Sequence, residues 1–275
     1  MFKYWTTSLA LVCVLGIGVA VAADKQYGPG VTDTEIKIGN TMPYSGPASA
    51  YGADGKAEAA YFAMINEQGG INGRKINFIS RDDGYSPPKT VEAVRKLVEE
   101  DQVLLIFGAL GTPPNTAIQA YLNDNKVPQL FIATGASKFN DPKSYPWTMA
   151  WYPNYPIEAR IYARYVLKNL PDARIAALTQ NDDSGKDFFS GLRDGLGEKA
   201  QKMIVGAETY ETTDTTFDSQ IVSLRARGAD VLFVGAIPKF AAPSDPQGLR
   251  HRLEPDFLSW LDIEFDRGGT AARRS

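Results

Sequence analysis

The chain of 275 residues contains one cysteine and one histidine. Cys13 lies in the apolar N-terminal run, so the chain that follows this run has no cysteine and must be held together by its core alone. His251 stands in an arginine-rich stretch near the end of the chain, which makes a serine or cysteine nucleophile with a histidine base hard to build. Among hydrolases, one that uses only carboxylates therefore remains open.

An excess of basic charge is also absent. The chain has 29 lysines and arginines against 32 acidic residues, a formal net charge of −3, and no basic stripe that would indicate a nucleic-acid partner. After the N-terminal run, no second apolar stretch is long enough for a membrane span, which needs about 20 residues. We therefore expect no nucleic-acid partner and no anchor downstream of the N-terminal run.

The N-terminus has the pattern of a secretory signal peptide. Lys3 precedes an apolar run over residues 9–21, and small residues follow at the positions where a signal peptidase cuts. We expect residues 1–23 to be removed and the product to be periplasmic. The remaining length of about 250 residues is enough for one large or two medium α/β domains.

Apolar strand-like runs alternate with segments of helical periodicity along the chain. Strands are expected at residues 35–41, 75–81, 103–107, 127–132, 174–179, 203–208 and 231–234, and helices at 53–67, 90–100, 116–123, 158–167, 186–199 and 217–227. This alternation is typical of βαβ units and predicts parallel sheets.

The alternation breaks over residues 140–156, where prolines and aromatic residues are concentrated. We interpret residues 146–156 as a hinge crossing between a first lobe, residues 24–145, and a second lobe, residues 157–242. The fold class predicted from the sequence is α/β, with two Rossmann-like lobes whose parallel sheets are joined by this hinge. Ligands bind at the carboxyl ends of strands in such open sheets, so a crevice between the lobes is the expected site.

Two strand ends carry the most informative pattern in the chain. The apolar run 103–107 leads into a glycine-rich turn that ends at Gly111 and Thr112, and a helix-like segment starts at Pro113. The run 127–132 delivers Ala136 and Ser137 to the same sheet edge. Free backbone N–H groups and the positive end of the helix dipole suit a carboxylate or another small anion. The alternatives are that Thr112 only starts a helix and that Ser137 only caps a turn.

Other patterns argue against a cofactor. The segment from Gly185 to Asp187 lacks the loop of a phosphate-binding P-loop, and the glycine turn at 108–111 lacks the dinucleotide fingerprint. The acidic pairs at 82–83 and 182–183 are expected to cap turns at strand ends, since no histidine accompanies them. We therefore expect neither a cofactor nor a metal.

Several short motifs occur in a characteristic order and spacing. They are IKIG at 36–39, YSGPA at 44–48, IN at 65–66, GGING at 69–73, DD at 82–83, FGA at 107–109, ATGAS at 133–137 and DSGKD at 183–187. Over residues 36–242 the chain resembles the periplasmic solute-binding proteins of branched-chain amino acid ABC transporters, the leucine/isoleucine/valine-binding family with the type I periplasmic binding fold.

This resemblance implies a monomeric protein without chemistry of its own, which closes on a ligand and docks on a membrane permease. It implies ligand contacts from the following residues: Tyr51, Gly111, Thr112, Ala136, Ser137, Ser184 and Ala236. The ligand that the resemblance implies is a branched-chain amino acid or a related amide or organic acid. The family often has aromatic residues at the position of Ser184 and near Ala236, so we expect a specificity that is not strictly for branched-chain amino acids. A ligand-sensing module of a receptor is the alternative with the same fold.

The C-terminal stretch departs from the pattern. Residues 243–275 contain no lysine, and the alternation of strands and helices stops. Translation of this stretch in a shifted frame, with codons chosen freely, yields a family-like helix and strand. We therefore hypothesise a one-base frameshift near Ala242 or Pro243, which would leave the second lobe incomplete and weaken binding; the alternative is a native, divergent tail.

Overall fold

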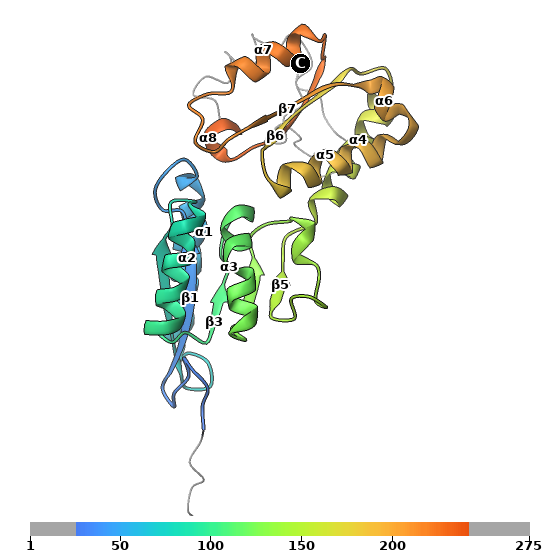
Figure 1. The fold of residues 1–275 in the computed structure, drawn as a ribbon. Helices are drawn as coiled ribbons and strands as arrows, with labels where there is room; N and C mark the ends of the chain where they lie inside the picture. The colour runs from blue at the N-terminus through green and yellow to red at the C-terminus, as the bar shows by residue number, and fades with distance from the viewer. Residues whose placement is uncertain (1–25, 242–275) are drawn as a thin grey trace, which may run out of the picture.

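Two parallel β-sheets organise residues 26–241, the part of the chain that the computed structural model describes. The first sheet has the strand order β2-β1-β3-β4-β5 and the second has the order β7-β6-β8. Figure 1 shows the second sheet and its helices above the first. The predicted α/β class with parallel sheets is confirmed, whereas the predicted signal peptide, the proposed frameshift and the atypical tail lie outside the described residues.

We call the first sheet and its helices the first lobe. Its strands are β1 (Glu35–Met42), β2 (Lys75–Asp82), β3 (Leu105–Phe107), β4 (Gln129–Ile132) and β5 (Thr148–Ala150). Its helices are α1 (Gly52–Glu67), α2 (Pro87–Arg95), continued by a π-turn over Lys96–Glu100, and α3 (Thr112–Asp124), with the short 3₁₀ turns η1 (Ser49–Tyr51) and η3 (Ser137–Phe139). The elements predicted for this lobe are all found, with shifts of a few residues at their ends. The strand β5 is found in addition and was not predicted.

Helices cover the first sheet from both sides. Buried residues of α2, of the π-turn that continues it and of α3, among them Leu97, Ile118 and Leu122, pack against Ile106 of β3. On the opposite face, Phe62 of α1 packs against aromatic rings of β2 and β3, with ring centroids 5.1 and 5.4 Å away. The carboxyl ends of the strands therefore stay open for loops, at the edge that faces the second lobe (Figure 1).

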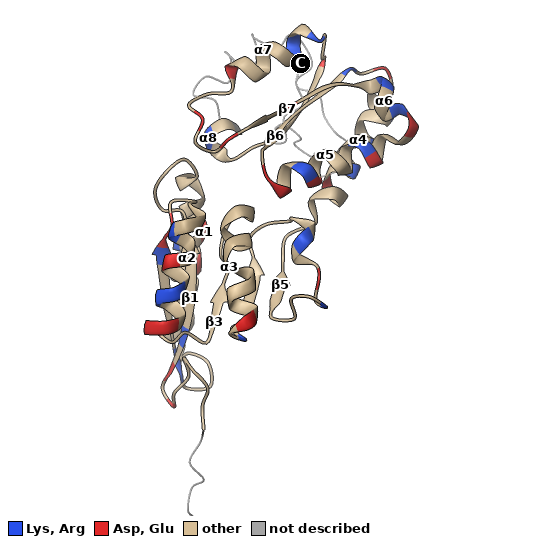
Figure 2. Cartoon of the chain, viewed as in Figure 1, with Lys and Arg blue, Asp and Glu red and all other residues tan. Residues whose placement is uncertain are grey.

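The second lobe is built on β6 (Ile175–Gln180), β7 (Ile204–Tyr210) and β8 (Val231–Gly235). Its helices are α4 (Tyr155–Asn169), α5 (Asp183–Leu196), α6 (Ala200–Met203), α7 (Asp218–Ala226) and α8 (Pro238–Ala241), and a 3₁₀ turn, η4, spans Gly197–Lys199. Every residue of β6 is buried, as expected of a central parallel strand that is covered on both faces. Figure 2 shows both acidic and basic residues on α5 and α7 of this lobe.

The proline-rich stretch between the lobes contains a strand that the sequence pattern did not predict. Thr148–Ala150 forms β5, which pairs in parallel with β4, so this part of the expected crossing belongs to the first sheet. The chain then enters α4, and the N–H of Tyr155 donates to the carbonyl of Gly135 at 2.9 Å. None of the helices in the described part of the chain has the length and apolar character of a membrane span.

Candidate ligand-binding site between the lobes

The loops that follow β3 and β4 lie side by side at the carboxyl edge of the first sheet. Leu110 and Ala133 form an isolated parallel bridge, and the N–H of Gly111 donates to the carbonyl of Ala133 at 3.2 Å. The structure therefore brings together the two turns in which the sequence placed the ligand's polar head.

Thr112 is the first residue of α3 and is buried at this junction. Its hydroxyl lies 2.6 Å from that of Thr134, which follows β4. Pro113 and Pro114 have no N–H, so in the first turn of α3 only the N–H of Thr112 is a donor that the helix itself does not use. Gly111 precedes it with φ 96°, a conformation that favours glycine. This arrangement suits one small anion or carbonyl oxygen.

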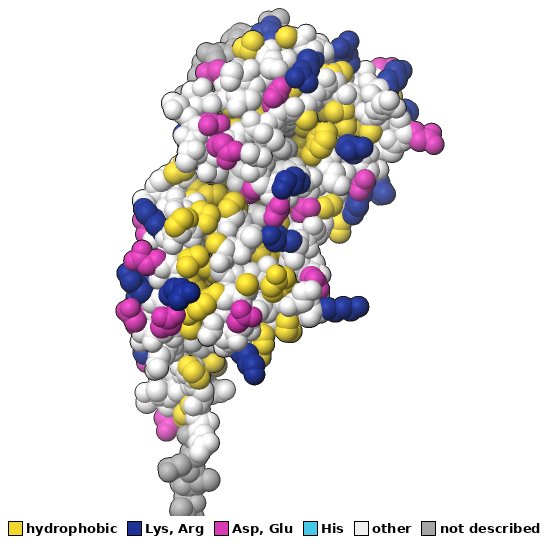
Figure 3. Space-filling view, viewed as in Figure 1, with side chains coloured by type: hydrophobic (Ala, Val, Ile, Leu, Met, Phe, Trp, Pro, Cys, Tyr) yellow, Lys and Arg dark blue, Asp and Glu magenta, His cyan; other side chains and the backbone are white. Residues whose placement is uncertain are grey.

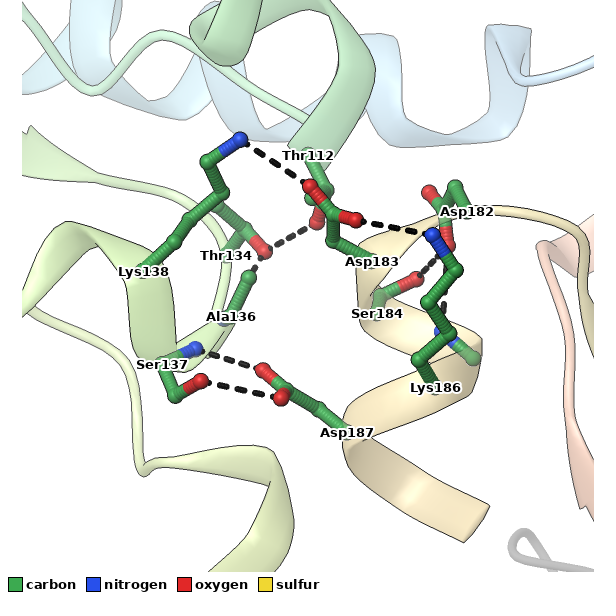
Figure 4. Close-up of polar contacts among 11 residues, drawn as sticks. Thr112, Thr134, Ala136, Ser137, Lys138, Asp182, Asp183, Ser184, Lys186 and Asp187 are labelled. Atoms are coloured by element: carbon green, nitrogen blue, oxygen red, sulfur yellow. Dashed lines mark hydrogen bonds and ion pairs between the residues drawn. The ribbon is translucent and has the colours of Figure 1, made fainter. Parts of the chain in front are cut away.

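Ala136 and Ser137 have different surroundings from each other. Ala136 is fully buried; its N–H donates to the Thr134 hydroxyl at 3.3 Å, and its carbonyl accepts from the N–H of Phe139 at 3.2 Å. Ser137 is exposed at the rim, and both its N–H and its hydroxyl donate to Asp187 of α5, at 2.6 and 2.9 Å (Figure 4). The donors that the resemblance assigned to a ligand are thus used within the protein in this arrangement.

A second contact at the rim is an ion pair. Lys138 Nζ lies 3.0 Å from Asp183 Oδ2, one helical turn before Asp187 (Figure 4). The hydrogen bond from Lys138, helped by Lys186, lowers the pKa of the Asp183 carboxyl despite its partial burial. Along the border between the lobes, Figure 3 shows basic and acidic side chains close together.

Ser184 belongs to the N-terminal cap of α5. Asp182 is the N-cap residue and accepts from the N–H of Gly185 at 3.0 Å, from Gln180 Nε2 at 2.7 Å and from the hydroxyl of Ser184 (Figure 4). Burial raises the pKa of the Asp182 carboxyl, and these hydrogen bonds oppose that effect. The structure therefore places the Ser184 side chain on the capping carboxylate.

Tyr51 and Ala236 meet at an apolar cluster that joins the two lobes. Buried residues of the second lobe, including Tyr210, Ile237 and Phe240, form this cluster with Ala48 of the first lobe, and Tyr51 and Ala236 pack against it. Burial raises the pKa of the Tyr51 hydroxyl well above its usual range. These two predicted residues line the junction from opposite lobes.

Two tyrosines at this junction were not predicted as site residues. Tyr155, the first residue of α4, places its hydroxyl 3.3 Å from that of Thr134, and its ring stacks on that of Phe188 with 4.3 Å between the centroids. Tyr85, in the turn between β2 and α2, packs against the same apolar cluster. Nothing in the sequence around Tyr85 indicates a site, because its position depends on a backbone conformation and on contacts distant in sequence.

The acidic pair at the end of β2 caps the loops around this turn. Asp82 accepts from the N–H groups of Tyr44, Ser45 and Gly84, at 2.9, 3.1 and 3.0 Å. Within residues 26–241, no three acidic, histidine or cysteine side chains are grouped so that they could hold a metal ion.

Known proteins share this architecture. The sequence profile described as periplasmic binding protein matches residues 35–251. A Leu/Ile/Val-binding protein homologue of Brucella melitensis is 26% identical over 234 residues, which cover 83% of this chain and 59% of the relative.

Solved structures agree. A substrate-binding periplasmic protein from Ralstonia solanacearum superposes with a TM-score of 0.73 at 26% identity, over 82% of this chain and 63% of the other. A solute-binding protein of an ABC transporter from Rhodopseudomonas palustris, in complex with 3,4-dihydroxybenzoic acid, superposes with a TM-score of 0.68 at 20% identity, over 82% and 61%. The chain thus spans about three fifths of the length of these proteins. With the matched profile covering most of its length, the chain belongs to the periplasmic binding protein family, among relatives of the Leu/Ile/Val-binding type.

Proposed function

We propose that this protein captures a small carboxylate-bearing ligand between its two lobes and delivers it to an ABC importer. The observation that carries the proposal is the Thr112–Thr134 junction, where two strand-end loops meet below the second lobe with the N–H of Thr112 at a helix start. A carboxylate at this point would gain a backbone donor and a hydroxyl donor, in a region of low water content where charge-assisted bonds are strong.

The division into lobes is part of this proposal. We infer that residues 24–145 and 157–242 move against each other about the part of the crossing at 146–156 that lies outside β5, and that closure keeps α5 and the turn at Ala236 against the first lobe. We propose a periplasmic protein exported through residues 1–23, which acts as a monomer and docks on a permease in the inner membrane. The descriptions of its relatives as periplasmic and as ABC transporter components support this part.

The ligand class is proposed as a branched-chain amino acid or a related amide or organic acid. A relative described as Leu/Ile/Val-binding supports the first choice, and a structural neighbour that holds 3,4-dihydroxybenzoic acid supports an organic acid. Ser184 and Ala236 are small, and Ser184 is engaged by Asp182, so we expect a specificity that differs from strict branched-chain recognition.

We propose that the protein has no catalytic activity and prefer an importer component to a receptor module or a carboxylate-based hydrolase. The matched relatives are described as binding proteins and substrate-binding components. The buried carboxylate of Asp182 caps α5, and the hydroxyls of Thr112 and Thr134 join two loops. The described part of the chain contains no histidine that could act as a base.

Calorimetric titration of the purified chain tests the proposal. The panel is L-leucine, L-leucinamide, octanoate and 3,4-dihydroxybenzoate, each recovered afterwards and checked for chemical change. We expect saturable binding of at least one carboxylate, unchanged on recovery, and a loss of about tenfold or more in affinity in Thr112→Val, because one charge-assisted bond is removed. Conversion of a ligand, or binding that is indifferent to Thr112→Val, would contradict the proposal.

A further inference from the structure

Tyr85 has an unusual backbone conformation. Its φ is 62° and follows Gly84 at φ 56°, so two successive residues lie in the left-handed region. A bulky aromatic residue rarely adopts this conformation, and such strain persists only where the surroundings enforce it, often at ligand sites.

Asp83 enforces this conformation. One carboxylate oxygen accepts from the N–H of Tyr85 at 2.9 Å, and the other accepts from the hydroxyl of Thr90 in α2 at 2.9 Å. The N–H of Ser86 also donates to the carbonyl of Asp83 at 2.9 Å. The backbone of the turn is therefore fixed at both ends, which sets the direction in which the Tyr85 side chain leaves it.

The ring of Tyr85 lies directly over the turn at which α3 begins. A Cβ atom built on Gly111 would lie 2.4 Å from Cε2 of Tyr85 and 3.1 Å from its hydroxyl oxygen, so the hydroxyl end of the ring rests on the Gly111 backbone. The same side chain packs against the apolar cluster that Tyr210 and other buried residues of the second lobe form. Tyr85 thus spans from the first lobe to the second, next to Thr112.

We propose that Tyr85 is a gate over the Gly111–Thr112 turn of the site. The inference rests on the proposed function, because it places the ligand's polar head on this turn. The edge of the Tyr85 ring, with Cε2 nearest, covers the Gly111 backbone beside Thr112, which itself is only 3% exposed. A ligand therefore binds only when it displaces the ring, and the work of displacement lowers the affinity of every ligand that uses the turn.

Amide hydrogen exchange tests the gate without a natural ligand. In Tyr85→Gly the exchange of the Thr112 amide should be about tenfold faster or more than in the wild type, since the ring no longer covers it. Addition of 4-methylphenol, which has the shape of the removed side chain, should restore protection. Tyr85→Phe keeps the ring and should leave the exchange unchanged.

A second glycine variant controls for the relief of backbone strain in Tyr85→Gly. Asn72 also has a positive φ, 51°, in the turn before β2, so Asn72→Gly relieves strain at a distance and should leave the Thr112 amide unaffected. If Tyr85→Gly does not fold, Tyr85→Asn removes the ring with a residue that tolerates this conformation. Unaltered Thr112 exchange in a folded variant without the ring would overturn the gate.

Titration with 3,4-dihydroxybenzoate and L-leucine completes the test. Tyr85→Gly should raise the affinity of the carboxylate that binds by about tenfold, and Thr112→Val in the same chain should abolish that gain. A loss of affinity in Tyr85→Gly would overturn the gate and make Tyr85 a direct ligand contact. Absence of binding in all variants would refute the proposed function, while the exchange measurement would still decide whether the ring covers Thr112.

Discussion

Asp187 of α5 accepts two hydrogen bonds from Ser137 of the first lobe, at 2.6 Å from the N–H and at 2.9 Å from the hydroxyl. The neighbouring pair of Lys138 and Asp183 adds a second link, at 3.0 Å. These contacts join the loop after β4 to the first turns of α5, so they hold the lobes in the arrangement described. Hydrogen bonds to a charged carboxylate are stronger than those between neutral groups, although partial exposure to solvent weakens them.

Removal of Asp187 should loosen the contact between the lobes. Asp187→Ala deletes both bonds to Ser137, and we expect a lower energy-transfer efficiency between dyes at Lys126→Cys and Lys202→Cys, two exposed positions in different lobes, in a Cys13→Ser background. Asp194→Ala is the matched control, because Asp194 pairs with Arg160 inside the second lobe, at 3.8 Å. Equal efficiencies in the two variants would show that the Ser137 contact does not hold the lobes.

The buried hydroxyl pair of Thr112 and Thr134 should contribute to stability as a unit. Thr112→Val and Thr134→Val should each lower the free energy of unfolding by about 1–2 kcal/mol, because each removes the hydrogen bond between the two buried hydroxyls. The double variant should lose less than the sum of the two. Urea unfolding of all four chains measures the coupling, and strict additivity would mean that the two hydroxyls do not interact.

Gly111 should be far less tolerant of a side chain than a glycine elsewhere with a similar backbone. In Gly111→Ala the new methyl group meets both a left-handed φ of 96° and the ring of Tyr85. Gly69→Ala is the control, since φ there is 106° but nothing lies within 4 Å of the added Cβ. We expect Gly111→Ala to be the more destabilising by about 1–3 kcal/mol, measured by urea unfolding. Similar losses would place the Tyr85 ring away from Gly111.

Glu58 should make stability depend on pH. Burial, with help from the charge of Asp54, raises the pKa of the Glu58 carboxyl from 4.5 to about 8. The folded chain therefore binds a proton that the unfolded chain releases between these values, so the free energy of unfolding should fall as pH rises from about 4.5 to 8.

Substitution isolates this effect. In Glu58→Gln the decline over the same pH range should become shallower, because the residue no longer titrates, while the amide can still accept from Asn40, whose Nδ2 lies 3.2 Å from the carboxylate. Glu67→Gln, at the exposed end of the same helix, should leave the slope unchanged. An unaltered slope in Glu58→Gln would assign the pH dependence to other groups.

Much of the fold could be predicted from the sequence, because periodicity within a segment decides whether it forms a strand or a helix. The run from Ile175 to Leu178 is apolar throughout and becomes the central, buried β6. The strand β5 was missed because it has only three residues inside a proline-rich stretch, and its pairing with β4 supplies the hydrogen bonds that local pattern does not reveal.

The site could be predicted only in part. Thr112 and Ala136 follow strands of one sheet, so strand order alone brings their loops together. The partners of Ser137 and Ser184 could not be predicted, because Asp187 lies in the other lobe and Asp182 acts through the geometry of a helix cap. Tyr85 was missed for the same reason: its importance comes from a φ value and from contact with Gly111, neither of which leaves a pattern in the sequence.

Ligand capture between the two lobes is tested most directly by hydrogen–deuterium exchange, resolved by peptide, with and without the carboxylate that binds in calorimetry. The expected result is protection at once in residues 108–115 and 133–138 of the first lobe and in residues 182–187 of the second, because a ligand at the Thr112–Thr134 junction contacts both. Protection confined to one lobe, or absent from residues 108–115, would contradict ligand capture at this junction.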